Sequence, residues 1–336
     1  MRPLSNPPNP YRSTHVEYLG EPPPAPLEVY EEQARSILSA NDSPDIPLQY
    51  SVNPYRGCQH ACAYCYARAS HEFLDWGAGT DFDRRIIVKV NAPELLSVEL
   101  TRTGVRGQTV GFSGNTDCYQ PLEASYELTR RCLQVCLQRR TPVAVITKAP
   151  LVQRDADLLK DLTSGPGARV FLSIPSLDRQ RTRAIEPGAS APAARFKAMR
   201  ALSDAGVPSG IAVAPLIPSL NDTDIVEILE RAADAGAKHA FMTLVHLHGA
   251  VRQVFEERLR EELPERAEHV LSALEQTRSS QSATAFHERM RGAGPRWAIL
   301  EQLFATTCRR LGLKYVAGVE YDVESDVGKA QQQEMF

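Results

Sequence analysis

The residues with the clearest capacity for chemistry are three cysteines close together in the first quarter of the chain. Cys58, Cys62 and Cys65 stand in a C-x3-C-x2-C spacing, so their three thiolates can converge on one inorganic centre. A closed zinc site or an ordinary four-iron cluster takes four ligands, and this motif supplies three. One metal position would therefore stay open for chemistry.

Two other interpretations of this motif are weaker. Zinc binding would recruit His60 as the fourth ligand, but His60 lies between two of the cysteines, where its ring would crowd the loop. Disulfides are disfavoured because three clustered cysteines cannot all pair, and because we expect no signal peptide before them. The remaining interpretation is an iron–sulfur cluster with three protein ligands.

The composition favours one barrel-sized domain with an appendage. The chain has 336 residues, a net charge of −3 and a sequence pI near 6.3. This charge argues against an obligate, globally basic nucleic-acid binder, but it leaves room for a local basic groove. We expect no membrane contact, because no run of about 18 apolar residues is present. The Pro-rich N-terminal stretch and a cluster that needs a reducing compartment together predict a cytoplasmic protein.

Apolar, β-branched runs alternate with helical patterns along most of the first 250 residues. This alternation is typical of repeated βα units around a parallel sheet. The runs predict strands at 49–52, 86–90, 109–113, 143–147, 170–174, 211–215 and 240–245. After residue 247 the pattern is mainly helical through residue 311, followed by a short strand at 314–319.

Two helices between these strands can be placed in more detail. Asn221-Asp222-Thr223 offers caps for a helix that Gly236 can end in a left-handed turn. Another helix is predicted from Pro121 to about residue 138. Its Cys132 and Cys136 lie four apart on one face, where small buried cysteines of a core are favoured over metal ligands.

The motif C-x3-C-x-aromatic-C, with Tyr64 as the aromatic residue, resembles the signature of the radical S-adenosylmethionine (SAM) superfamily. Within it, the chain is similar to the spore photoproduct lyase branch, whose members are also called DNA-repair photolyase-like proteins. The matching stretches keep their order and spacing over roughly residues 50 to 220, at 63–66, 147–148, 171–174, 186–188 and 211–215.

This resemblance implies an α/β fold, a partial (β/α)6 TIM-like barrel of the radical SAM type with a C-terminal helical extension. Six of the seven predicted strands would build the barrel, and the extra one is 86–90 or an N-terminal piece. The chain is accordingly divided into a mostly flexible tail (1–45), the barrel (46–250), a helical cap (251–320) and a second flexible tail (321–336).

The resemblance also implies the cofactors. A [4Fe-4S] cluster would be held by Cys58, Cys62 and Cys65, with its fourth iron chelated by the amino and carboxylate groups of SAM. Reductive cleavage of SAM would then produce a 5′-deoxyadenosyl radical that abstracts a hydrogen atom from a substrate. The electron would come from a donor such as flavodoxin or ferredoxin.

Further residues are assigned to SAM by the same resemblance. Lys148 would meet the carboxylate of SAM and Ala214 its adenine, each at the end of a predicted strand, where barrels of βα units present their chemistry. From turn chemistry alone, Thr116 or Asp117 is equally a helix cap. A lysine at a strand end has the alternative role of a solvated charge, but its place at the mouth of a barrel favours anion binding. The full set of expected SAM-binding residues is Tyr64, Thr116, Asp117, Lys148, Ser173 and Ala214.

The chain departs from the lyase at the position of its hydrogen donor. In the lyase a cysteine on the loop after a strand donates a hydrogen atom to the product radical, and the alignment puts Gly114 there. Cys118 would substitute if the loop bends inward, whereas a buried structural cysteine is an equal alternative. Tyr64 and Tyr66 match tyrosines of the lyase's radical relay. The catalytic candidates are Tyr66 and Cys118, and cleavage of spore photoproduct itself is not expected.

The last five residues, Gln332 to Phe336, are similar to the peptide with which bacterial DNA repair and replication proteins dock the sliding clamp. This similarity would tie the protein to DNA.

The sequence as a whole leaves three functions open. The first is a radical SAM enzyme acting on a nucleic-acid base, in repair or modification. The second is a radical SAM enzyme with a small-molecule or peptide substrate, and the third is a non-catalytic iron–sulfur protein for electron transfer.

Overall fold

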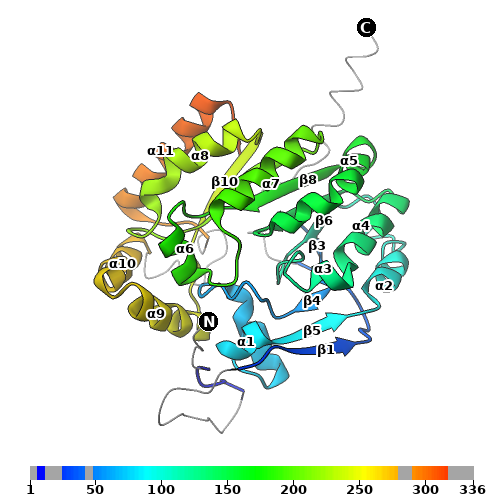
Figure 1. Cartoon of the computed structure of the whole chain (residues 1–336), viewed down its shortest axis with the longest axis horizontal. Coiled ribbons are helices and arrows are strands. Elements are labelled where there is room, and N and C mark those ends of the chain that lie inside the picture. Colours follow the sequence, from blue (N-terminus) through cyan, green and yellow to red (C-terminus); the bar gives the residue numbers. More distant parts are fainter. Residues whose placement is uncertain (1–5, 12–24, 42–47, 279–289, 317–336) are drawn as a thin grey trace.

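The chain is built around one open, mostly parallel sheet. The structure is a computed structural model that describes residues 6–11, 25–41, 48–278 and 290–316 (Figure 1). Its main sheet has the strand order β11-β10-β9-β8-β7-β6-β3-β2. Six neighbours in it run parallel, namely β3 (Tyr50–Val52), β6 (Val110–Phe112), β7 (Val143–Thr147), β8 (Ala168–Ser173), β9 (Ser209–Leu216) and β10 (His239–Leu244). The predicted partial (β/α)6 barrel is therefore confirmed.

Strand β7 shows why these segments form strands buried on both faces. Val143 and Val145 join the core beneath the outer helices, whereas Ala144 and Ile146 face the interior of the barrel, near Phe241. Alternate residues of a strand point to opposite faces, so a strand with apolar neighbours on both sides needs a nearly continuous apolar run. This explains why the sequence shows no polar alternation here.

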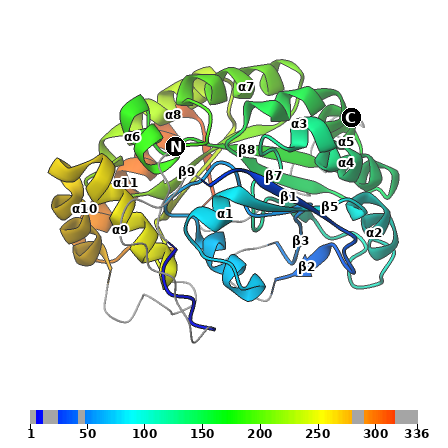
Figure 2. The ribbon, with the colours of Figure 1, turned by 60° about the horizontal axis from the view of Figure 1, so that its bottom comes forward.

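Helices cover the outer face of the sheet (Figures 1 and 2). The longer ones follow the strands in βα order and are α2 (Ala92–Glu99), α4 (Leu128–Gln138), α5 (Ala156–Ser164), α7 (Pro192–Asp204) and α8 (Ile225–Asp234). Shorter elements connect them, namely η1 (Tyr66–Leu74), α1 (Thr80–Arg84), α3 (Glu123–Tyr126), η2 (Pro150–Asp155), α6 (Arg179–Ile185) and η3 (Asp222–Asp224). Cys132 and Cys136 of α4 are fully buried in this layer, as predicted.

The helix predicted from 121 to 138 is instead two helices. It breaks at Glu127, which adopts a left-handed conformation with φ 51° between α3 and α4. The buried Glu123 carboxylate accepts hydrogen bonds from the backbone N–H groups of Thr129 (2.9 Å) and Arg130 (3.3 Å). It thus satisfies free donors at the start of α4, which stabilises a second helix start.

The helix predicted to begin at the Asn221 caps starts later, at Ile225. Asn221 is used in the preceding turn, where its amide accepts from the N–H of Ile217 (2.7 Å) and donates to the carbonyl of Pro215 (3.0 Å). Gly236 follows the helix with φ +90°, as predicted for a left-handed end.

A second sheet, of three strands, lies beside the barrel in the order β1-β5-β4. It consists of β1 (Glu28–Glu32), β4 (Tyr55–Arg56) and β5 (Arg85–Lys89), so the extra strand predicted at 86–90 does lie outside the barrel. Strand β2 (Leu38–Ala40) pairs antiparallel with β3 at one edge of the main sheet. The segment 1–45, expected to be mostly a flexible tail, thus contributes two strands.

The C-terminal region divides into two parts. Helices α9 (Ala250–Glu262) and α10 (Pro264–Thr277) pack on each other, and α9 contacts η1 and α6. Helix α11 (Gly294–Leu311) packs on α8, and β11 (Lys314–Tyr315) extends the barrel sheet beside β10. The strand expected at 314–319 is therefore present at its start, and residues 317–319 lie outside the described part. Within that part, no helix has the length and apolar character needed to cross a bilayer.

The strand β2 depends on one buried carboxylate, which generates a first prediction. Glu99 is 2% exposed and accepts hydrogen bonds from the N–H groups of Ile37 (3.1 Å) and Leu38 (2.8 Å). We expect Glu99→Ala to lower the free energy of unfolding by about 1–3 kcal/mol, because both donors lose their acceptor. Hydrogen exchange at Ile37 and Leu38 should accelerate.

The control for this variant is Glu94→Ala on the same helix, whose exposed carboxylate pairs with Arg131. A surface pair of this kind contributes about 0–1 kcal/mol, and exchange at residues 37 and 38 should stay as in the wild type. Equal exchange in both variants would contradict the assignment.

Candidate functional site

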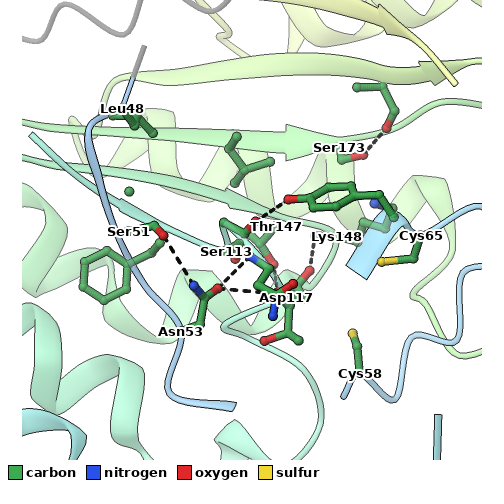
Figure 3. A pocket seen from close by; sticks show the side chains of 18 of the residues that line it. Leu48, Ser51, Asn53, Cys58, Cys65, Ser113, Asp117, Thr147, Lys148 and Ser173 are labelled. Carbon is green, nitrogen blue, oxygen red and sulfur yellow. Dashed lines mark hydrogen bonds between the residues drawn. The ribbon is translucent and has the colours of Figure 1, made fainter. Parts of the chain in front are cut away.

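A cavity of about 510 Å³ opens at the carboxyl ends of the parallel strands (Figure 3). Both sheets contribute to its wall. From the barrel come residues in and just after β6 and β7, together with Ser173 at the end of β8 and Ala214 of β9. From the small sheet come Tyr55, Arg56 and Lys89. It brings together most of the predicted site residues: Cys58, Cys62, Cys65, Tyr66, Thr116, Asp117, Lys148, Ser173 and Ala214.

The three cysteines form one wall of this cavity. Figure 3 shows the sulfurs of Cys58 and Cys65 directed toward the same space. Burial raises the pKa of all three thiols, that of Cys62 to about 12. Thiols in this environment become good ligands when a metal centre replaces their protons.

The donor set suits a cluster better than a single ion. Among the described residues, no group of three histidine, cysteine or acidic side chains is placed to hold one metal ion. A four-iron cluster instead takes one thiolate at each of three separate irons, so its ligands stand further apart. Cys58, Cys62 and Cys65 all line one cavity, as the three ligands of one cluster must.

Buried hydrogen bonds from neighbouring side chains hold the cysteine loop (residues 57–66). The fully buried Arg68 donates from Nε to the carbonyl of Cys62 (2.8 Å) and from Nη2 to Asp83 Oδ1 (2.8 Å). On the other side, Gln120 accepts from the N–H of Gln59 (3.0 Å) and donates to the carbonyl of Gly57 (3.1 Å). The loop is therefore preorganised by the protein.

The segment 186–188 holds the same loop from the barrel side. The N–H of Gly188 donates to the carbonyl of His60 (3.0 Å), and the N–H of Ala63 donates to that of Ile185 (2.9 Å). A Cβ on Gly188 would lie 2.0 Å from the carbonyl oxygen of Gln59. Only glycine permits this approach.

A buried charge network lies beneath the loop. Glu186 and Arg195 are both 0% exposed at the side chain and form an ion pair of 2.6 Å, and the Tyr64 hydroxyl donates to Glu186. Arg195 also donates to the carbonyl of Ser173 (2.8 Å). Although burial opposes ionisation, Arg195 and Lys148 hold the pKa of Glu186 below its ordinary value. The network thus links Tyr64 to the end of β8, and Tyr64 lies outside the cavity lining.

Lys148 is the cation of the cavity nearest to this network. Its Nζ lies 5.7 Å from the centre of the Tyr64 ring. Burial disfavours its charge, but the neighbouring Cys62 and Glu186 raise its pKa above the ordinary value. Lys148 therefore carries a positive charge into the cavity at neutral pH, as an anion ligand requires.

Asp117 is engaged within the protein through both of its carboxylate oxygens. Its carboxylate accepts from the Thr147 hydroxyl (2.7 Å) and from the N–H groups of Lys148 (2.8 Å) and Tyr119 (2.9 Å), and His60 Nδ1 lies 3.2 Å away. Although burial opposes ionisation, His60 and these donors hold its pKa well below the ordinary range. Because both oxygens are occupied, Asp117 positions the ends of β6 and β7.

The hydroxyl groups of Thr116 and Ser173 are also bonded to the backbone. Thr116 donates to the carbonyl of Tyr55 (3.0 Å), and Ser173 donates to that of Ala214 (2.8 Å). Since each hydroxyl hydrogen is engaged, each oxygen is left as an acceptor on the cavity wall. Asn53 was not predicted from the sequence to be a site residue. Its side chain accepts a hydrogen bond from the N–H of Asn115 (2.7 Å) and supports the loop that follows β6.

The two catalytic candidates occupy different places. Tyr66 lines the cavity, and its hydroxyl donates to the carbonyl of Gly114. Cys118 is fully buried in the core between the sheet and the outer helices, and it does not line the cavity. The inward bend that would have made Cys118 a hydrogen donor is absent, because Ser113 Oγ accepts from its N–H (3.0 Å) and holds the loop.

The fold and this cavity have the form of a partial barrel with a three-cysteine loop at its mouth. Residues 52–232, more than half of the chain, match the Radical SAM superfamily, and the chain belongs to this superfamily. Its members use a [4Fe-4S] cluster and SAM. They generally take their electrons from flavodoxin or ferredoxin.

Relatives in sequence are similar over part of their length. An uncharacterized protein of Mycobacterium tuberculosis is 37% identical over 212 residues, which cover 62% of each chain. An uncharacterized protein of Methanocaldococcus jannaschii is 29% identical over 200 residues, 60% of this chain and 72% of the relative. The chain thus spans about 62% of the length of the mycobacterial relative.

Solved structures of spore photoproduct lyase share the fold. A complex with dinucleoside spore photoproduct superposes with a TM-score of 0.61 at 17% identity, covering 85% of this chain and 81% of the lyase. A doubly substituted mutant with bound AdoMet and the same dinucleoside reaches a TM-score of 0.59 at 17% identity, covering 85% and 80%. At 17% identity, this similarity shows that the two proteins share a fold and shows nothing further.

The close approach of Gly188 generates the next prediction. Gly188→Ala should displace the cysteine loop, because its Cβ would overlap a backbone carbonyl that cannot rotate away. We expect iron retained after anaerobic reconstitution to fall at least severalfold, measured against protein concentration. Gly104→Ala is the control, since the nearest atom to its new Cβ would be the Tyr50 hydroxyl at 3.5 Å. Full iron content in the Gly188 variant would refute the packing argument.

The charge network under the loop gives another prediction. Glu186→Gln should lower the free energy of unfolding by about 3–5 kcal/mol, because Arg195 would stay buried without its counter-ion. Adding Arg195→Met should recover part of this loss in a double-mutant cycle measured by urea unfolding. Glu227→Gln, in the exposed pair with Arg231, is the control and should cost less than about 1 kcal/mol. Additive effects of the two core substitutions would contradict a direct coupling.

Proposed function

We propose that this radical SAM enzyme binds its cluster through Cys58, Cys62 and Cys65 and holds SAM across the same cavity. The observation that carries this proposal is one cavity of about 510 Å³ lined both by the three cysteines and by polar strand ends. When bound, the cluster and SAM supply reductive cleavage of SAM and a 5′-deoxyadenosyl radical that abstracts a hydrogen atom from the substrate.

The proposed contacts to SAM follow the charge and hydrogen-bonding capacity of the wall. Lys148 carries the positive charge that suits the carboxylate of SAM. Thr116 and Ser173 present hydroxyl oxygens with their hydrogens already donated, so they suit the amino group of SAM and other donors. Ala214 offers a small apolar surface for the adenine. Tyr64 and Asp117 would act by positioning, since Tyr64 lies outside the cavity lining and both Asp117 oxygens accept hydrogen bonds within the protein.

A nucleic-acid base is the proposed substrate. Support comes from the shared fold with spore photoproduct lyase and from the two cations of the small sheet, Arg56 and Lys89, in the cavity wall. Such a base would have to be single-stranded or flipped out of a duplex to enter the cavity. The C-terminal residues Gln332 to Phe336, outside the described part, would link the enzyme to DNA through a sliding clamp. A cytoplasmic location, with flavodoxin or ferredoxin as electron donor, belongs to the same proposal.

The proposed reaction differs from that of the lyase in its hydrogen donor. Gly114 stands where the resemblance places the donor cysteine, and a Cβ there would lie 2.8 Å from the Ser51 side chain, so a larger residue at this position would require Ser51 to move. The hydroxyl of Tyr66 lies on the carbonyl of Gly114. We assign to Tyr66 the donation of its hydroxyl hydrogen atom to the product radical: the O–H bond breaks and a C–H bond forms. The tyrosyl radical left behind would be restored by one electron from the flavodoxin or ferredoxin donor and one proton.

Anaerobic turnover tests the proposal. The reconstituted, reduced wild type should convert SAM to 5′-deoxyadenosine, and the nucleoside should accumulate faster when single-stranded DNA is present. The Cys58→Ala, Cys62→Ala, Cys65→Ala triple variant should form none above background, because the cluster has no ligands left. Liquid chromatography of the nucleoside measures both.

The remaining outcomes separate the alternatives. Cleavage that is indifferent to DNA and RNA would move the substrate to small molecules or peptides. No cleavage by a wild type with full iron content would favour an electron carrier instead.

A further inference from the structure

Two cations of the small sheet lie next to each other in the cavity wall. Arg56 on β4 pairs with Ile87 on β5, and Lys89 stands two residues further along β5. Residues two apart on a strand share a face, so Lys89 is a diagonal neighbour of Arg56 on one side of this sheet. Both side chains line the cavity that the three cysteines also line.

Neither cation has a counter-ion in the part of the chain that the structure describes. Within the described residues, neither side chain forms a hydrogen bond or an ion pair. Burial lowers the pKa of Lys89, and the charge of Arg56 lowers it further, while Glu32 and Glu99 oppose this from beyond ion-pair distance. The Glu99 carboxylate is already engaged by the N–H groups of Ile37 and Leu38. Two like charges in a half-buried wall without a partner are costly, and a bound anion would relieve this cost.

The charge balance of the described cavity lining points the same way. Among the described residues, this lining contains Arg56, Lys89 and Lys148 against one carboxylate, Asp117. That carboxylate is saturated by donors from Thr147, Lys148 and Tyr119. Lys148 has the Glu186 carboxylate nearby, and under the proposed function its charge is also balanced by the carboxylate of SAM. Arg56 and Lys89 are left for another anion.

We propose that Arg56 and Lys89 form a subsite for the phosphate of a nucleotide substrate. This inference rests on the proposed function and deepens it. The planar fork of an arginine and the point charge of a lysine suit the several oxygens of one phosphate. Arg56 lies two residues before Cys58, so a phosphate held here places its nucleoside at the cysteine wall.

The phosphate belongs either to a polynucleotide backbone or to a free nucleotide. The chemistry of the subsite is the same for both, so the test uses two probes. One is a short fluorescein-labelled single-stranded oligodeoxynucleotide, and the other is an unlabelled thymidine monophosphate as competitor. Binding is measured by fluorescence anisotropy on the cluster-reconstituted protein, without SAM or reductant.

We expect Arg56→Gln and Lys89→Gln each to weaken binding of the oligonucleotide about tenfold, as for the loss of a hydrogen bond to a charged group. Each variant should also reduce the slope of log Kd against log salt by about 0.7, the value for one lost contact to a single strand. If thymidine monophosphate displaces the oligonucleotide with a Kd similar to that of the oligonucleotide itself, the site binds a free nucleotide. If the monophosphate does not displace the oligonucleotide, the site binds the polynucleotide backbone.

Arg85→Gln is the matched control, because Arg85 is the other diagonal neighbour of Arg56 on β5 but lies near Glu28 (3.5 Å) and outside the cavity lining. It removes the same charge from the same sheet and should leave the affinity and the salt slope as in the wild type. Iron content and circular dichroism of each variant report whether it folds.

Three results would overturn the inference. They are the absence of binding by the wild type, equal losses in Arg85→Gln and in the two cavity variants, or an affinity in Arg56→Gln and Lys89→Gln equal to that of the wild type. Because the assay contains no SAM, its failure is distinct from a failure of SAM cleavage. A wild type that cleaves SAM yet binds neither probe would keep the enzyme and remove this subsite.

Discussion

The cysteine loop must present three thiols to one cavity, and the protein holds it in that form through buried backbone contacts. Arg68 and Gln120 bind its carbonyl and amide groups from two sides, and Gly188 lets the chain after β8 come within contact of its backbone. A loop ordered in this way loses little conformational entropy when a cluster binds. The remaining features of the site are arranged around this constraint.

Two buried carboxylates contribute to that arrangement. Asp117 joins the ends of β6 and β7 to the neighbourhood of His60, and Glu186 joins Tyr64 of the loop to Arg195 behind β8. Each is buried and fully bonded, so each is held ionised despite its desolvation. Their function is to set the distances between strand ends, which is how a barrel keeps residues from distant parts of the chain in register around one cavity.

The cavity wall then has two electrostatic regions. Lys148 lies by the cysteines and the Glu186 network, whereas Arg56 and Lys89 stand on the small sheet without counter-ions among the described residues. A protein with a net charge of −3 thus concentrates positive charge where a substrate would enter. Such local concentration draws anions to a site that the overall charge would not favour.

The sequence by itself determined the superfamily, the cofactors and the parallel barrel, because a local cysteine spacing and a βα alternation are written in consecutive residues. The sequence also predicted that Lys148, Ser173 and Ala214 lie at one end of the barrel, because each stands in or just after a strand. All three line the cavity. Only the tertiary structure placed Cys118 in the core, broke the helix at Glu127 and joined Arg56 with Lys89. The reason is that each of these depends on groups far apart in the chain, whose meeting no local pattern records.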